Sequence, residues 1–160
     1  MILNIPNYLS LLRIGLIPCL ILVFYVPDDT LSAYDKNLTA TLIFLFAAIT
    51  DWLDGYLARR LNQTSDFGAF IDPVADKLIV IAALILLAEL GRIESIVAFI
   101  IIAREFTISS LREWMATLGK SGSIAVAFIG KFKTTMQMIA ILFLLYYDNI
   151  LFIPVALIGK

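Results

Sequence analysis

The chain has 160 residues, of which 61% are hydrophobic, with a formal net charge of −1 and no histidine. An ordinary soluble domain is only about half apolar, so this composition excludes one and indicates a single domain in a lipid bilayer. The lack of histidine excludes Ser-His and Cys-His catalytic schemes and leaves mainly oxygen ligands for a metal, which favours hard cations such as Mg²⁺ or Mn²⁺.

Long apolar runs separated by polar turns predict an all-α, polytopic membrane bundle with five full transmembrane helices and the start of a sixth. We expect Pro18 to interrupt the first span and Pro73 to break the third near its start, as membrane helices tolerate. A polar loop is expected at 119–123. The expected spans are 8–26, 38–61, 67–90, 95–117 and 132–147.

Both ends of the chain depart from this pattern. Residues 1–7 resemble a short amphipathic segment and lack the basic region of a signal peptide, so we expect the first span to be retained. The last apolar run, 150–158, is much shorter than the roughly 20 residues of a membrane helix. We therefore expect one domain over 1–160, shortened at its C-terminus.

The placement of Lys and Arg predicts the orientation. If successive spans alternate in direction, only Lys36 and Arg92 lie on one side of the membrane. The other side, which carries more Lys and Arg, is expected to face the cytoplasm together with the N-terminus and the 62–66 turn. Arg13 is interpreted as an anchor at this interface. The basic residues of the cytoplasmic side are Arg13, Arg59, Arg60, Arg112, Lys120, Lys131 and Lys133.

Four aspartates interrupt the second and third spans. Asp51 and Asp54 are three apart on one helix face, and Asp72 and Asp76 are four apart on the next helix. All four lie about 12–20 Å of helix length from the turn near Thr64, so antiparallel helices would bring them to one level. Carboxylates held together repel unless cations neutralise them, which predicts one or two divalent metal ions. A single aspartate here could instead form a structural ion pair, but four at matched depth favour function.

The residues beside the aspartates suit a phosphate-bearing ligand. Gly55, Gly68 and Ala58 leave room for a substrate to approach the helix backbone. The Arg59 guanidinium can form two parallel hydrogen bonds to phosphate oxygens, and Ser65 places a hydroxyl at the turn. Because histidine is absent, Asp76 is the expected general base for an attacking hydroxyl. The residues of this expected site are Gly55, Ala58, Arg59, Ser65 and Gly68.

Read from Asp51 to Asp76, the pattern Asp-x₂-Asp-Gly-x₂-Ala-Arg-x₈-Gly-x₃-Asp-x₃-Asp resembles the signature of the CDP-alcohol phosphatidyltransferase family at every defined position. The likeness covers nearly the whole chain, except that family members carry a complete sixth helix. The further segments that resemble the family are 4–7, 67–77, 103–105, 111–115 and 130–134.

This resemblance implies transfer of a phosphatidyl group from CDP-diacylglycerol to sn-glycerol 3-phosphate, with release of CMP. It implies two Mg²⁺ or Mn²⁺ ions on the four aspartates, CDP-diacylglycerol contacts by the five residues above, and Asp76 as the base that frees the glycerol 1-hydroxyl to attack the β-phosphorus. It also implies a homodimer in the bacterial cytoplasmic membrane, with the active site on the cytoplasmic side.

An acceptor that carries phosphate needs cationic side chains. We expect these to be Arg104, Arg112, Lys131 and Lys133, because an arginine at membrane depth usually faces the bundle interior. A place at the membrane interface could also explain Arg112, Lys131 and Lys133, and it explains Arg112 and Lys133 equally well. Arg104 could instead pair with Glu105 or Glu113.

Other functions remain open from the residues alone. The acceptor could be inositol phosphate, serine or a phosphatidyl lipid. A membrane prenyltransferase also uses Asp-rich motifs, but it needs two of them and more spans. A divalent-cation transporter with a ring of carboxylates is the non-enzymatic alternative.

Overall fold

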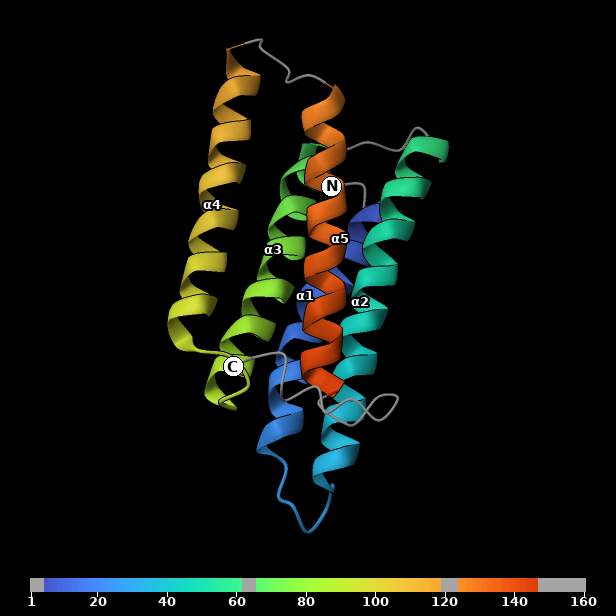
Figure 1. Cartoon of the computed structure of the whole chain (residues 1–160). Coiled ribbons are helices and arrows are strands. Elements are labelled where there is room, and N and C mark those ends of the chain that lie inside the picture. Colours follow the sequence, from blue (N-terminus) through green and yellow to red (C-terminus); the bar gives the residue numbers. More distant parts are fainter. Residues whose placement is uncertain (1–4, 62–65, 119–123, 147–160) are drawn as a thin grey trace.

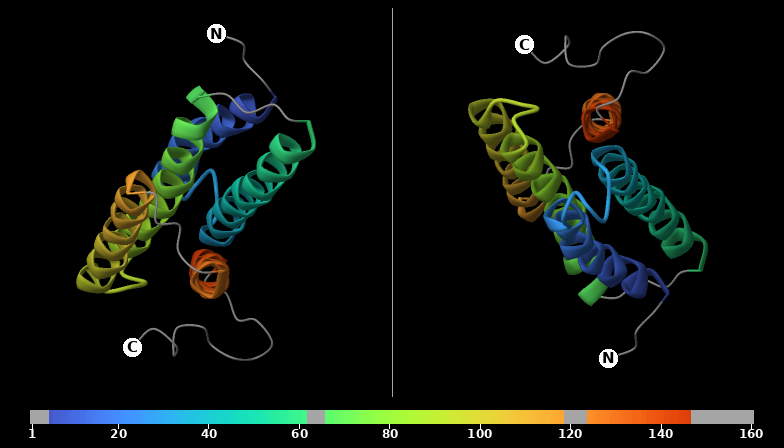
Figure 2. Two further views of the ribbon diagram at one scale, coloured as in Figure 1. Left: turned by 90° about the horizontal axis from the view of Figure 1, so that it is seen from above. Right: turned by 90° about the horizontal axis from the view of Figure 1, so that it is seen from below.

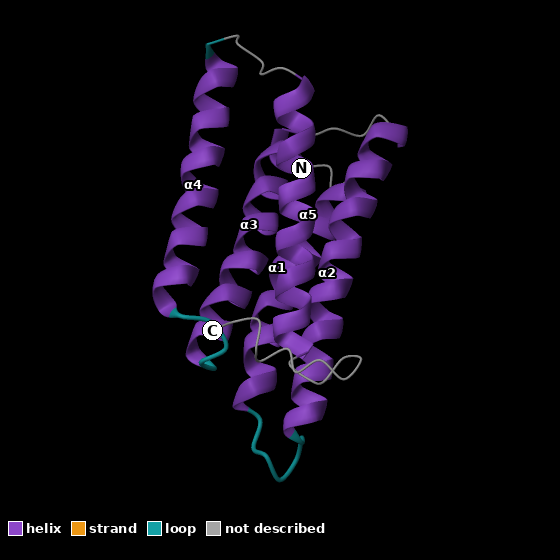
Figure 3. Ribbon diagram, viewed as in Figure 1, coloured by secondary structure: helices purple, strands orange, loops and turns teal. Residues whose placement is uncertain are grey.

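The computed structural model describes residues 5–61, 66–118 and 124–146, and these ranges form five α-helices without a β-strand (Figures 1 and 3). This confirms the predicted all-α bundle. The expected loop at 119–123 and the last apolar run at 150–158 lie outside the described residues. The helices are α1 (Ile5–Tyr25), α2 (Ala33–Leu61), α3 (Asp66–Glu89), α4 (Ser95–Thr117) and α5 (Ile124–Tyr146).

Successive helices run in opposite directions, and α1 lies between α2 and α3 (Figures 1 and 2). α1 packs extensively on both of them, whereas α2 and α3 contact each other little. α5 packs on α2 and α3, and α4 lies at the edge of the bundle on α3. The two aspartate-bearing helices are therefore antiparallel, as predicted, but they are joined mainly through α1.

The apolar core fills the half of the bundle where α1 and α3 end. Its fully buried side chains include Leu20 on α1, Phe44 on α2, Leu87 on α3 and Leu145 on α5. In the other half the buried positions of α1 are polar, among them Ser10. Close packing of apolar side chains thus holds one half of the bundle together, whereas the other half of α1 buries polar side chains.

Helices α2 and α5 begin earlier than expected. The Ser32 hydroxyl accepts a hydrogen bond from the Asp35 backbone N–H (3.2 Å) and donates one to Asp35 Oδ2 (2.7 Å), so Ser32 caps α2 ahead of the expected residue 38. α5 begins at Ile124 rather than at residue 132. The intervening residues are largely apolar and contain no proline, so nothing in the sequence stops the helix there.

The predicted break at Pro73 is wrong. α3 is helical from Asp66 to Glu89 with Pro73 inside it, and α1 likewise continues through Pro18. A proline removes one backbone donor, and neighbouring helices or local adjustments can satisfy the carbonyl that it frees. The carboxylates of α3 are therefore carried by one continuous helix.

Arg92 ties the helices together at the end of the bundle where the apolar core lies. It donates hydrogen bonds to the carbonyls of Leu144 (3.0 Å) and Leu145 (2.8 Å) and to Asn37 Oδ1. Its guanidinium carbon also lies 5.8 Å from the centre of the Phe24 ring. These contacts satisfy carbonyls at the last turn of α5, which have no partner within the helix.

Among the described residues, Asn7–Tyr25 is the one segment that is both long and apolar enough by itself to cross a membrane. Lys133–Tyr146 is a shorter apolar segment. The other helices, of 23 to 29 residues, have the length of a span and carry charged side chains.

Candidate active site

Asp51, on α2, forms an ion pair with a buried arginine of α1. Arg13 Nη1 lies 2.8 Å from Asp51 Oδ1. The Arg13 side chain is fully buried, whereas that of Asp51 is 40% exposed. The prediction that Arg13 is an interfacial anchor is therefore wrong, because its guanidinium lies inside the bundle, where a buried charge needs a partner of opposite sign.

Asp72, on α3, accepts a hydrogen bond from the hydroxyl of Ser10 on α1. Ser10 is fully buried and lies three residues before Arg13, so both side chains share one face of α1. Sequence reasoning missed Ser10. The available signal was its spacing from Arg13 within an otherwise apolar helix.

Asp76 lies one turn after Asp72 on α3. Among the side chains that the structure describes, none forms a hydrogen bond with its buried oxygen Oδ1. Asp51, Arg13 and Glu105 all lie within the range of its electrostatic interactions. Leaving a buried carboxylate oxygen without a partner is costly, so this oxygen is available to a cation or to a donor on a ligand.

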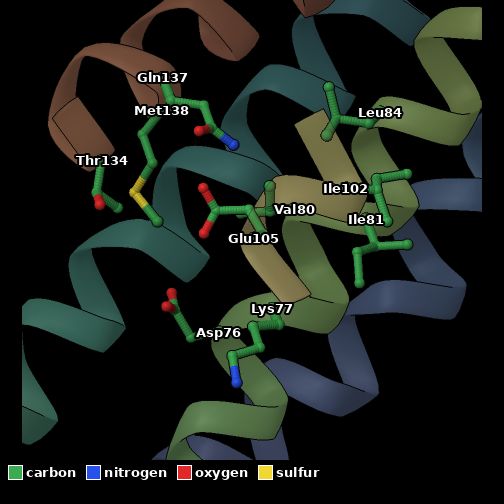
Figure 4. Close-up of a pocket in the computed structure, with 10 residues that line it drawn as sticks. All are labelled: Asp76, Lys77, Val80, Ile81, Leu84, Ile102, Glu105, Thr134, Gln137 and Met138. Atoms are coloured by element: carbon green, nitrogen blue, oxygen red, sulfur yellow. The ribbon is translucent and has the colours of Figure 1, made fainter. Parts of the chain in front are cut away.

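A small cavity of about 30 Å³ lies beside Asp76 (Figure 4). Asp76 of α3, Glu105 of α4 and Gln137 of α5 converge on it, and Thr134 lies nearby. This volume holds about one water or hydroxyl group. Figure 4 shows the Lys77 ammonium pointing away from Glu105 and Gln137.

Arg104, on α4, contacts two of the residues that line this cavity. Its Nη1 is 3.2 Å from Gln137 Oε1 and 3.2 Å from Glu105 Oε1. The pairing with Glu105 is one of the alternatives that the sequence left open. Sequence reasoning missed Gln137, although it lies one helical turn after Lys133, whose side chain is exposed.

The structure brings some of the predicted residues together and leaves others undescribed. Gly68 is buried on α3. Among the side chains described, which exclude that of Asp54, there is no group of three or more carboxylates close enough to share a metal ion. Ser65 lies outside the described residues. The predicted residues placed by their backbone alone are Asp54, Gly55, Ala58 and Arg59 on α2, Arg112 on α4 and Lys131 on α5.

The chemistry of these donors fits a hard divalent cation. Asp51 and Asp72 are carboxylates held by partners on α1, and Asp76 has a buried oxygen that no described donor occupies. Oxygen donors of this kind are those that Mg²⁺ and Mn²⁺ prefer. The residues present therefore fit such an ion.

Comparison with known proteins places the sequence pattern in context. Residues 3–159 match the family described as CDP-alcohol phosphatidyltransferase. A CDP-diacylglycerol–glycerol-3-phosphate 3-phosphatidyltransferase of Wigglesworthia glossinidia brevipalpis is 48% identical over 98% of this chain and 85% of its own length. The protein of the same name from Escherichia coli K12 is 53% identical over 92% of this chain and 79% of its own length.

Proposed function

The chain belongs to the CDP-alcohol phosphatidyltransferase family, and we propose that it transfers the phosphatidyl group of CDP-diacylglycerol to sn-glycerol 3-phosphate, releasing CMP. It is a membrane-associated transferase of phospholipid biosynthesis. The observation that carries the assignment is the aspartate pattern on α2 and α3, with Asp76 beside a cavity that Gln137, a partner of Arg104, also lines.

The proposed metal ligands are Asp51, Asp54, Asp72 and Asp76, which would hold one or two Mg²⁺ or Mn²⁺ ions. When bound, such ions neutralise the diphosphate and stabilise the leaving CMP. The unpartnered Oδ1 of Asp76 and the partial exposure of Asp51 support this assignment.

The proposed contacts to CDP-diacylglycerol come from the residues around the signature. Small side chains let the nucleotide approach α2 closely, and the Arg59 guanidinium suits phosphate oxygens. Gly68, on α3, has no side chain that would obstruct the approach of the nucleotide. The residues proposed for this role are Gly55, Ala58, Arg59, Ser65 and Gly68.

In the proposed reaction, Asp76 accepts the proton of the glycerol 1-hydroxyl. The hydroxyl oxygen forms a bond to the β-phosphorus, and the bond from that phosphorus to the bridging oxygen of CMP breaks. The cavity beside Asp76 has room for about one hydroxyl, which supports this role.

The acceptor's phosphate is proposed to bind to Arg104, Arg112, Lys131 and Lys133. The Arg104 guanidinium contacts Gln137 and Glu105, and both of these residues line the Asp76 cavity. A guanidinium that is already held in place binds phosphate better than a mobile one, because little side-chain entropy is lost on binding.

The orientation and oligomeric state are proposals as well. The active site is proposed to face the cytoplasm of a bacterial cell, because more of the basic residues belong to the end of the bundle where α2 ends and α3 begins than to the end that carries Lys36 and Arg92. A homodimer is proposed because the family resemblance implies one, and it would also cover exposed apolar side chains such as Phe99 and Trp114 on α4.

Cation-dependent release of CMP from CDP-diacylglycerol tests this function against the cation transporter. The purified chain, in micelles with glycerol 3-phosphate, is expected to release CMP with Mg²⁺ or Mn²⁺ and not after chelation. Uptake of Mn²⁺ into proteoliposomes without any CMP release would overturn the proposal in favour of transport.

A further inference from the structure

One face of α1 carries buried polar side chains where an apolar membrane helix would bury apolar ones. Asn7, Ser10 and Arg13 are at most 2% exposed, and they follow one another at intervals of three residues. Further along the same helix the buried side chain is that of Leu20. The polar segment lies at the level of the aspartates, and the apolar segment lies at the level of the core.

We propose that Ser10 and Arg13 are positioning residues. Their hydrogen bonds orient the proposed metal ligands Asp72 and Asp51 from the α1 side. This inference rests on the proposed function of the aspartates. It means that α1 contributes residues to the proposed metal site, although α1 lies outside the signature from Asp51 to Asp76.

The packing of the helices gives α1 this role. α2 and α3 contact each other little, so neither fixes the distance between Asp51 and Asp72. α1 packs on both, and within one turn it offers a guanidinium to Asp51 and a hydroxyl to Asp72. Hydrogen bonds of this kind fix the orientation of a carboxylate and thereby its geometry toward a metal.

The Arg13 side chain acts from the inside of the bundle. It is fully buried, and its Nη1 engages one oxygen of Asp51 while 40% of the Asp51 side chain remains exposed. The carboxylate is thus fixed on one side and accessible on the other, as a metal ligand held by an outer partner must be.

Arg13 has two effects on metal binding, and they have opposite signs. Its positive charge repels a cation and lowers the affinity, since it also lies within electrostatic range of Asp76. Its hydrogen bond orients Asp51 and raises the affinity. Orientation dominates, so removing Arg13 weakens metal binding even though a repelling charge is lost.

Titration of the purified full-length chain with Mn²⁺ in detergent, followed by electron paramagnetic resonance without substrates, tests the proposal directly. Arg13→Gln, Arg13→Lys and Ser10→Ala are each expected to weaken Mn²⁺ binding by about 10- to 100-fold, because outer partners of metal ligands have effects of this size. Ser10→Thr keeps the hydroxyl and is expected to bind nearly as wild type.

Lys36→Gln is the matched control. Lys36 Nζ lies 2.5 Å from Asp28 Oδ1 at the other end of the bundle, and Lys36 is largely buried. This variant is expected to lower the unfolding temperature and to leave the Mn²⁺ affinity unchanged. If Arg13→Gln does not fold, Arg13→Lys and Ser10→Ala decide the outcome.

Two results would overturn the inference while the proposed function stands. One is wild-type Mn²⁺ affinity in Arg13→Lys and Ser10→Ala, and the other is tighter binding in Arg13→Gln, which would show that only the charge matters. A wild-type chain that binds no Mn²⁺ would instead contradict the proposed metal site itself.

Discussion

Arg104 Nη1 on α4 lies 3.2 Å from Gln137 Oε1 on α5, and this hydrogen bond connects the two helices beside the cavity of Asp76. Both helices pack on α3, which carries Asp76. The guanidinium is therefore held next to two residues of the cavity where the attacking hydroxyl is proposed to bind. Three helices, α3, α4 and α5, contribute to this proposed acceptor site, although the signature motif covers only α2 and α3.

Replacing Arg104 by Gln is expected to raise the KM for glycerol 3-phosphate by about 10- to 100-fold, since a hydrogen bond to a charged group contributes about 1.5–3 kcal/mol. The KM for CDP-diacylglycerol should change little. Steady-state kinetics of CMP release measure both constants. Gln137→Leu should cause a smaller effect in the same direction, and an unchanged acceptor KM in Arg104→Gln would remove Arg104 from the phosphate pocket.

Asp76→Asn is expected to lower turnover by about 10²- to 10⁴-fold at saturating metal and substrates, because a general base contributes about this much. The control Asp29→Asn changes an exposed aspartate in the connection between α1 and α2 and should keep wild-type turnover. Single-turnover release of CMP measures the effect. Retained turnover in a metal-loaded Asp76→Asn protein would show that another group accepts the proton.

Mn²⁺ is expected to raise the unfolding temperature of the chain, because a ligand that binds only the native state stabilises it. The gain is about 2.7 kcal/mol at 100 times the dissociation constant. Asp51→Asn and Asp72→Asn should reduce this gain. Unfolding in detergent, with and without chelator, measures it, and equal stabilisation of both variants and the wild type would place the metal elsewhere.

Arg92→Met is expected to lower the free energy of unfolding by about 1–3 kcal/mol, because the carbonyls of Leu144 and Leu145 lose their donor. Catalysis should be retained below the unfolding temperature, since Arg92 lies at the end of the bundle away from the aspartates. Denaturant unfolding followed by circular dichroism measures stability, with Arg92→Lys as an intermediate case. A stability equal to wild type would show that these hydrogen bonds contribute nothing.

Much of the fold was predictable from hydrophobic runs, and the order and direction of the helices agree with them. The start of α2 was missed because an apolarity criterion ignores the Ser32 cap, which sets the helix boundary through hydrogen bonds to Asp35. The break at Pro73 was wrong because one lost donor does not end a helix that its neighbours support.

The site was predictable where its residues are close in sequence and not where packing brings distant residues together. The aspartates follow helical spacing, so a motif could identify them. Arg13 and Ser10 reach them only because α1 lies between α2 and α3, which no spacing within the chain reveals. Glu105 and Gln137 line the cavity beside Asp76 because α4 and α5 both pack on α3, which the spacing of residues does not reveal either.

The most direct test of the central claim is the choice of acceptor. CMP release from CDP-diacylglycerol with Mn²⁺ is measured with glycerol 3-phosphate, free glycerol, serine and inositol phosphate at equal concentrations. The proposed function predicts rapid release with glycerol 3-phosphate and at most slow release with the other three. Equal release with free glycerol, or faster release with serine or inositol phosphate, would contradict the proposed function.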